Sequence, residues 1–114
     1  MHAFHVLREP VRRRILELLA ESEHSSGQVT AVIAKEFGIT QPAVSMHLRV
    51  LRESGFATVR PEGARRIYTM DGGPLAEMDA WLQQFRTFWD HRLNPLDTEI
   101  ARGRKRKKLE DPSP

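Results

Sequence analysis

Two predicted helices separated by only three residues constrain the fold of this chain more than any other feature. Apolar residues recur at helical spacing through 26–37 and again through 41–54, and the turn between them is Gly38-Ile39-Thr40. Glycine commonly follows the last residue of a helix, and threonine commonly caps the start of the next. The pattern predicts a helix-turn-helix, whose second helix could lie in a DNA groove.

A third amphipathic segment, residues 10–21, precedes this pair. It opens with Pro10, which suits the first turn of a helix because its missing N–H needs no partner there. The spacing of Ser25 and Gln28 predicts a capping box at the start of the second helix. The expected buried residues are Val11, Ile15, Leu18 and Leu19, then Val29, Val32, Ile33 and Phe37, then Ile39 in the turn, and finally Val44, Leu48 and Leu51.

The segment after the third helix has the pattern of a β-hairpin. "FATVR" and "RRIYTM" alternate between polar and apolar residues, and "PEGA", 61–64, has the composition of a turn. Arg60, Arg65 and Arg66 flank the predicted tip. A helix-turn-helix followed by a basic hairpin predicts a winged helix, a mainly α fold with a small β-hairpin wing.

Residues 74–93 are predicted to form one long helix with an unusually wide apolar face. Such a face favours a dimer interface, and the alternative is packing against the preceding helices. Pro95 predicts a kink or restart, followed by a short helix to about residue 101. The apolar face comprises Leu75, Met78, Leu82, Phe85, Trp89 and Leu93, with Trp81 and Phe88 in a second stripe.

Charge is distributed unevenly in a chain whose net charge is +3. Residues 40–70 hold five arginines and two glutamates, whereas 71–101 hold six acidic residues and two arginines. This asymmetry is typical of a nucleic-acid surface that is separate from a pairing surface. We therefore expect a winged-helix domain over 1–101, with 74–101 as its dimerisation segment. The basic segment 102–114 is expected to be a disordered tail that either adds non-specific DNA affinity or is merely solvated.

Several classes of protein do not fit the sequence. The absence of cysteine removes disulfides and thiolate metal sites. No stretch of 18 apolar residues and no secretion signal were found, so we expect a cytoplasmic protein with no membrane partner. The sequence contains no nucleophile–base pair and no phosphate-binding glycine loop, so we do not expect an enzyme.

A helical wheel divides the third helix into a core face and an outer face. Val44, Leu48 and Leu51 lie on the core face, and Pro42, Ser45, Met46 and Arg49 lie on the outer one, with Gln41 near the helix start. Gln41 could pair with adenine, and Arg49 and Arg52 are expected at phosphates. Met46 offers no donor to a base but can touch a thymine methyl group.

The role of His47, on the shoulder of this helix, is open between two alternatives. It either donates to a DNA phosphate or packs on a neighbouring helix. Arg12, Arg13 and Arg14 could likewise meet the DNA backbone, although at least one is expected to form an ion pair.

The segment "FGITQPAVSMHLRVLRESGFATVRPEGARRIYTM", preceded by "PVRRRILELLAE", resembles the ArsR/SmtB family of bacterial winged-helix transcriptional regulators. "LAEMDAWLQQFRTFWDHRL" resembles its subgroup that lacks metal-site cysteines. The resemblance covers residues 6–101. It implies a homodimer, paired through its first and last helices, that represses from a palindromic operator on double-stranded DNA until an effector, here unknown, relieves repression.

The resemblance also assigns site residues. It places Thr40, Gln41, Pro42, Ser45, His47, Arg65 and Arg66 at the DNA, to which the wheel and charge patterns add Met46, Arg49, Arg52 and Arg60. Met46 departs from the family, which usually has a polar or basic residue there. The expected dimer contacts are Phe4, Leu7, Leu75, Met78, Trp81, Leu82, Phe85, Phe88, Trp89 and Leu93.

The family's carboxylate–imidazole metal sites need aspartate–histidine pairs on the last helix. That segment has only His91, beside Asp90, so we expect no metal and no other cofactor. Two alternatives are retained: a metal-responsive repressor with a histidine–carboxylate site, and a winged-helix module that binds a protein partner.

Overall fold

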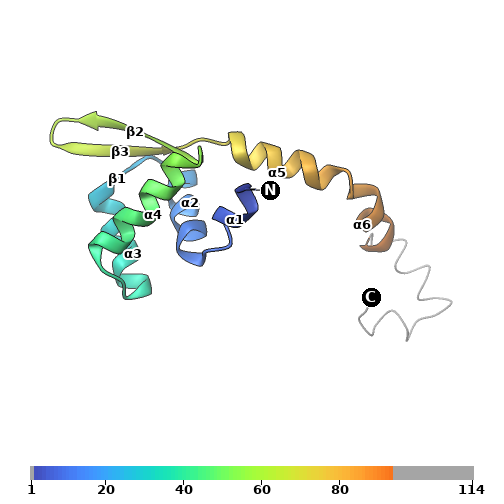
Figure 1. Ribbon diagram of the computed structural model, residues 1–114, viewed down its shortest axis with the longest axis horizontal. Helices are drawn as coiled ribbons and strands as arrows, with labels where there is room; N and C mark the ends of the chain where they lie inside the picture. The colour runs from blue at the N-terminus through green and yellow to red at the C-terminus, as the bar shows by residue number, and fades with distance from the viewer. Residues whose placement is uncertain (1, 94–114) are drawn as a thin grey trace. The chain divides into compact units, whose positions relative to one another are not determined.

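A computed structural model describes residues 2–93 of the chain (Figure 1). These residues belong to two compact units, one ending at Met78 and the other beginning at Asp79. The elements in order are α1 (His2–Val6), α2 (Pro10–Glu21), β1 (His24–Ser25), α3 (Ser26–Phe37), α4 (Gln41–Glu53), β2 (Ala57–Glu62), β3 (Arg65–Met70), α5 (Gly73–Gln83) and α6 (Arg86–Leu93).

The predicted helix-turn-helix is confirmed, together with its local signals. Ser25 and Gln28 form the capping box at the start of α3, and Gly38 ends that helix with a positive φ of 65°. The hydroxyl of Thr40 accepts a hydrogen bond from the Ala43 N–H at 3.3 Å, which caps α4. Ile39, in the turn, packs against the core. The three-residue turn is therefore defined at one end by the positive φ of Gly38 and at the other by the side-chain cap of Thr40.

The predicted wing is also confirmed, in an extended form. The antiparallel pairing of β2 with β3 runs from Ala57–Met70 to Glu62–Arg65, so the loop contains only Gly63 and Ala64. Gly63 has a φ of 64°, as the first position of a type II′ hairpin turn requires. Pro61 lies within β2, which is tolerated because β2 is an edge of the sheet. The hairpin projects beyond the helices of its unit (Figure 1).

Strand β1 was not predicted. Its two residues pair antiparallel with β3, which makes β3 the central strand of a sheet ordered β1-β3-β2. A two-residue strand shows no alternating pattern, so residues 22–25 gave no signal other than that of a linker. The pairing ties the start of α3 to the wing.

One core unites the helices and the base of the wing in the first unit. The predicted buried residues of α2 and α4 are confirmed, as are Val29 and Ile33 in α3, while Val32 is partly buried against them. The prediction that Phe37 is buried is wrong, because the residue is 38% exposed at the end of α3. Phe56 is fully buried and is the largest such side chain.

The single long helix predicted over 74–93 is also wrong. The structure has α5 and α6, and between them Gln84 and Phe85 form a turn. The Phe85 N–H bonds to the Leu82 carbonyl at 3.0 Å, a hydrogen bond three residues back that tightens the helix end. The predicted kink at Pro95, the short helix after it and the basic tail lie outside the described residues.

Candidate nucleic-acid interface

Helix α4 presents two faces of opposite character. Val44, Leu48 and Leu51 are at most 1% exposed and fix the helix to the core. Five residues of the outer face line a shallow hollow of about 340 Å³: Gln41, Pro42, Ser45, Met46 and Arg49. The structure thus brings together the outer-face residues that the helical wheel selected. Whether they contact DNA remains a prediction at this point.

The outer face also carries free positive charge. The side chains of Arg49 and Arg52 are exposed, and no described residue forms an ion pair with either. Cations near the surface of a helix that are not already paired are available to phosphates. Thr40 differs, because its hydroxyl is engaged in capping α4.

His47 takes the packed position of its two alternatives. Its side chain is only 9% exposed, and the Arg12 Nε donates to the His47 Nδ1 at 3.2 Å (α2 to α4). Because a guanidinium can only donate, Nδ1 must be unprotonated, and the neutral ring carries its proton on Nε2. A contact between that Nε2–H and DNA remains a prediction.

Burial and the neighbouring Arg12 cation lower the pKa of His47, while Glu9 acts in the opposite direction. In the unfolded chain the pKa returns to its usual value of about 6.5. Between the two pKa values the unfolded chain binds more protons, so stability rises with pH there. The stability from neutral His47 is complete above the unfolded pKa and is lost as pH falls through the folded one.

We expect His47→Gln to remove this acid sensitivity, because the glutamine amide oxygen can accept from Arg12 but does not titrate. Urea unfolding of both proteins from about pH 8 to about pH 5 measures it. The free energy of unfolding should fall more steeply with acid in the parent chain than in His47→Gln. Parallel curves would show that His47 does not titrate differently on folding.

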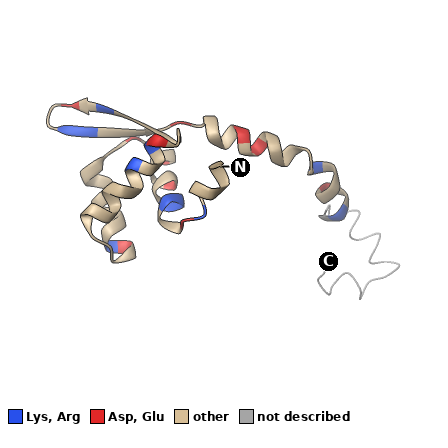
Figure 2. Cartoon of the chain, in the orientation of Figure 1, with Lys and Arg blue, Asp and Glu red and all other residues tan. Residues whose placement is uncertain are grey.

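The wing arginines are not equivalent. Arg60 makes two hydrogen bonds to the Glu23 carboxylate, at 2.9 and 3.0 Å, and one to Glu62 at 3.3 Å. These bonds lower the pKa of Glu23. Arg65 lies 3.9 Å from Glu62, whereas no described residue forms an ion pair with Arg66. Figure 2 shows basic residues, in blue, at the end of β3 nearest the hairpin tip.

The arginines of α2 all have partners. Arg14 bonds to Glu36 at 2.9 and 3.2 Å, which confirms the expected ion pair. Arg13 donates to the carbonyls of Leu7 and Arg8, at 2.7 and 3.1 Å, and so holds the segment after α1. Sequence reasoning missed the particular pairs Arg12–His47, Arg14–Glu36 and Arg60–Glu23, because their members are 22 to 37 residues apart and no local pattern joins them.

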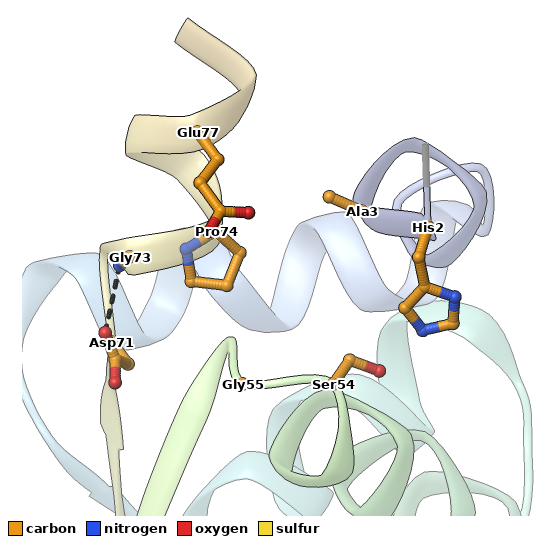
Figure 3. A pocket seen from close by; sticks show the side chains of 8 residues that line it. All are labelled: His2, Ala3, Ser54, Gly55, Asp71, Gly73, Pro74 and Glu77. Carbon is orange, nitrogen blue, oxygen red and sulfur yellow. Dashed lines mark hydrogen bonds between the residues drawn. The ribbon is translucent and has the colours of Figure 1, made fainter. Parts of the chain in front are cut away.

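A second hollow, of about 320 Å³, contains an imidazole and two carboxylates. Asp71 accepts from the Gly73 N–H at 2.9 Å and so starts α5, and His2 lies on the other side of the hollow (Figure 3). Nowhere in residues 2–93 do three histidine or acidic side chains gather as metal ligands do.

The expected dimer residues differ in how far they are buried. Leu7, Leu75 and Met78 are partly buried against the core of the first unit, which is the packing alternative for this part of the face. Several aromatic side chains remain open to solvent: Phe4 at 36%, Trp81 at 44%, Phe85 at 40% and Phe88 at 58% exposure. Leu82 and Trp89 are half-buried, and the side chain of Leu93 lies outside the described residues.

The order of the helices and the hairpin together define a winged helix-turn-helix protein. The model of the family described as "Bacterial regulatory protein, arsR family" matches residues 9–59. The HTH-type transcriptional regulator Rv2034 of Mycobacterium tuberculosis is 35% identical over 85 residues, which cover 75% of this chain and 76% of that protein. The chain belongs to the ArsR family of bacterial regulators, a family of transcription regulators and not of enzymes.

Two further similarities are informative. The transcriptional repressor SdpR of Bacillus subtilis is 27% identical over 92 residues, covering 81% of this chain and 98% of that one. The solution structure of the homodimeric winged helix-turn-helix DNA-binding domain of Mb0332 from Mycobacterium bovis matches with a TM-score of 0.56 and 26% identity, covering 80% of this chain and 78% of that one. Within residues 2–93, the helices are too short or too polar to cross a membrane.

Proposed function

We propose that this chain is a homodimeric repressor that binds a palindromic operator with α4 in the major groove. One observation carries the proposal: α4 is fixed to the core by fully buried residues, while its exposed side holds Gln41 and Ser45. The same side carries Arg49 and Arg52, which form no ion pair with any described residue. A rigid helix with polar and cationic groups facing outward suits groove binding. Because a bacterial regulator of this kind acts on DNA, a cytoplasmic location is part of the proposal.

Each α4 contributes two kinds of contact in this proposal. Gln41, Ser45 and Met46 reach base edges near the start of the helix, where recognition helices usually read sequence. Arg49 and Arg52 meet phosphates, which set affinity and register. Thr40 brings the first turn of α4 close to the DNA backbone, and Pro42 faces the base edges beside Met46. Arg65 and Arg66 extend the contact to the minor groove or to further phosphates.

Two of the remaining site residues act indirectly in the proposal. Arg60 is held by Glu23 and keeps the wing beside the β1–α3 connection, so its main role is to position the wing. His47 positions α4 through Arg12, and its Nε2–H is the group that could also reach a phosphate.

The homodimer rests on the aromatic side chains of residues 79–93. Trp81 and Phe85 stack edge to face with centroids 5.0 Å apart, and Phe88 is 58% exposed with the Arg92 guanidinium 4.8 Å from its ring centre. An apolar cluster of this kind is typical of the centre of a protein interface. The homodimeric state of Mb0332 supports the same assembly here. We extend the dimerisation segment to residue 101, beyond the described residues, and leave the tail as a separate basic segment.

Phe88→Asp should convert the dimer to a monomer, because it places a charge in the apolar contact. Sedimentation velocity at micromolar concentration measures the change. Thr87→Ala, on the same helix, is the control and should remain a dimer. If Phe88→Asp sediments as a dimer, the interface lies elsewhere.

Footprinting tests the operator. Hydroxyl radicals applied to the DNA upstream of the gene should reveal two protected patches related by symmetry, with centres about 10 base pairs or a multiple apart. Transcription in vitro from that promoter should fall when the protein is added, as the relation to the repressor SdpR suggests. One unsymmetrical patch would contradict the palindrome, and an increase in transcription would contradict repression.

A further inference from the structure

Met46 stands at a place where a polar or cationic side chain would be expected. It lies on the outer face of α4 and is 38% exposed. It lines the shallow hollow on this face together with Pro42, one helical turn before it, and Arg49, just under one turn after it. The core side of the helix is already filled by Val44, Leu48 and Leu51, so the thioether is not needed for folding.

The chemistry of the major groove restricts what this side chain can recognise. A thioether has no donor and is only a weak acceptor, so it cannot satisfy the acceptors of guanine, the N7 of adenine or the O4 of thymine. Covering such an acceptor without a hydrogen bond is unfavourable. The C5-methyl group of thymine is the apolar group that base pairs display in this groove.

We propose that Met46, with the ring of Pro42 beside it, recognises a thymine methyl group in each half-site of the operator. This inference rests on the proposed function and deepens it, since it names the base group that the hollow accepts. The methyl group enters the hollow between Pro42 and Met46. Gln41 and Ser45 line the same hollow and supply the polar contacts on either side. The two-fold symmetry of a dimer requires the thymine at equivalent positions of both half-sites.

Uracil substitution isolates the methyl group, because uracil differs from thymine only in lacking it. The operator duplex is made with each thymine replaced in turn by uracil, and Kd is measured by fluorescence anisotropy at fixed salt. At one thymine per half-site, we expect Kd to rise about fourfold, the effect of one buried methyl group. Replacing both symmetric thymines should raise it roughly 16-fold if the two sites are independent.

Variants of Met46 assign the effect to this residue. Met46→Ala should bind the thymine and uracil operators equally well, whereas Met46→Leu should keep most of the difference because it preserves an apolar contact. Ser45→Ala is the matched control: its overall affinity can change, but its thymine-to-uracil ratio should not. A duplex with 5-methylcytosine at the same position should bind more tightly than one with cytosine.

The outcomes separate this inference from the function on which it rests. If the protein binds the operator but no thymine shows a uracil effect, or if the effect persists in Met46→Ala, the methyl contact is wrong while the repressor proposal stands. If the protein binds no DNA duplex, the proposed function itself fails.

Discussion

Replacing Arg65 and Arg66 together by alanine is expected to weaken DNA binding roughly 100-fold at moderate salt, for all sequences alike. The two side chains leave the sheet on opposite faces, because they are consecutive residues of β3. Both are exposed at the end of the strand nearest the two-residue turn, and neither has a strong ion pair within the described residues. Two copies of the wing in a dimer supply up to four phosphate contacts.

Salt dependence distinguishes this electrostatic role from a structural one. The slope of log K against log salt should become shallower by about 0.9 for each contact that is lost, so by up to about 3.6 in the double variant. The control is the double variant Arg8→Ala, Arg86→Ala, which removes two positive charges from exposed positions outside the wing. It should leave the slope almost unchanged. Equal slopes in the parent chain and in Arg65→Ala, Arg66→Ala would place the wing away from the DNA.

Phe56→Ala should destabilise the chain by about 3–5 kcal/mol, a large part of the stability of a domain of this size. The Phe56 ring is fully buried. Its N–H donates to the Leu51 carbonyl at 2.9 Å, and its carbonyl accepts from the Asp71 N–H at 2.8 Å. The residue therefore joins the end of α4, the start of β2 and the end of β3 at one point in the core.

The chain provides a control of the same residue type. Phe37 is 38% exposed, so Phe37→Ala should cost about 1 kcal/mol or less in urea unfolding. Phe56→Leu, which keeps most of the volume, covers the case in which the alanine variant does not fold, and should lose roughly 1–2 kcal/mol. Equal losses for Phe37→Ala and Phe56→Ala would contradict the proposed role of Phe56.

The helix-turn-helix and the wing were predictable because their signals are local. Gly38 and Thr40 mark the two sides of the turn by their own backbone and capping preferences. Gly63 marks the hairpin tip in the same way, although composition alone made the turn two residues too long. The division of α4 into a core face and an outer face followed from the helical repeat.

The errors arose where the decisive interaction is not local. The apolar repeat continues through Gln84 and Phe85 without glycine or proline, so nothing in the sequence marks the break between α5 and α6. Phe37 has the right spacing for the core, but α3 ends there and the side chain stays exposed. His47 could not be assigned because its partner, Arg12, lies 35 residues earlier in the chain.

Binding of the purified protein to DNA from its own promoter region, measured between about 50 and 200 mM salt, tests the central claim most directly. A dimer that places two copies of α4 and the wing on phosphates should lose at least about 100-fold in affinity over this range and should prefer promoter DNA to unrelated DNA. No binding, or an affinity that does not change with salt, would contradict the claim and would favour a winged-helix module that binds a protein partner.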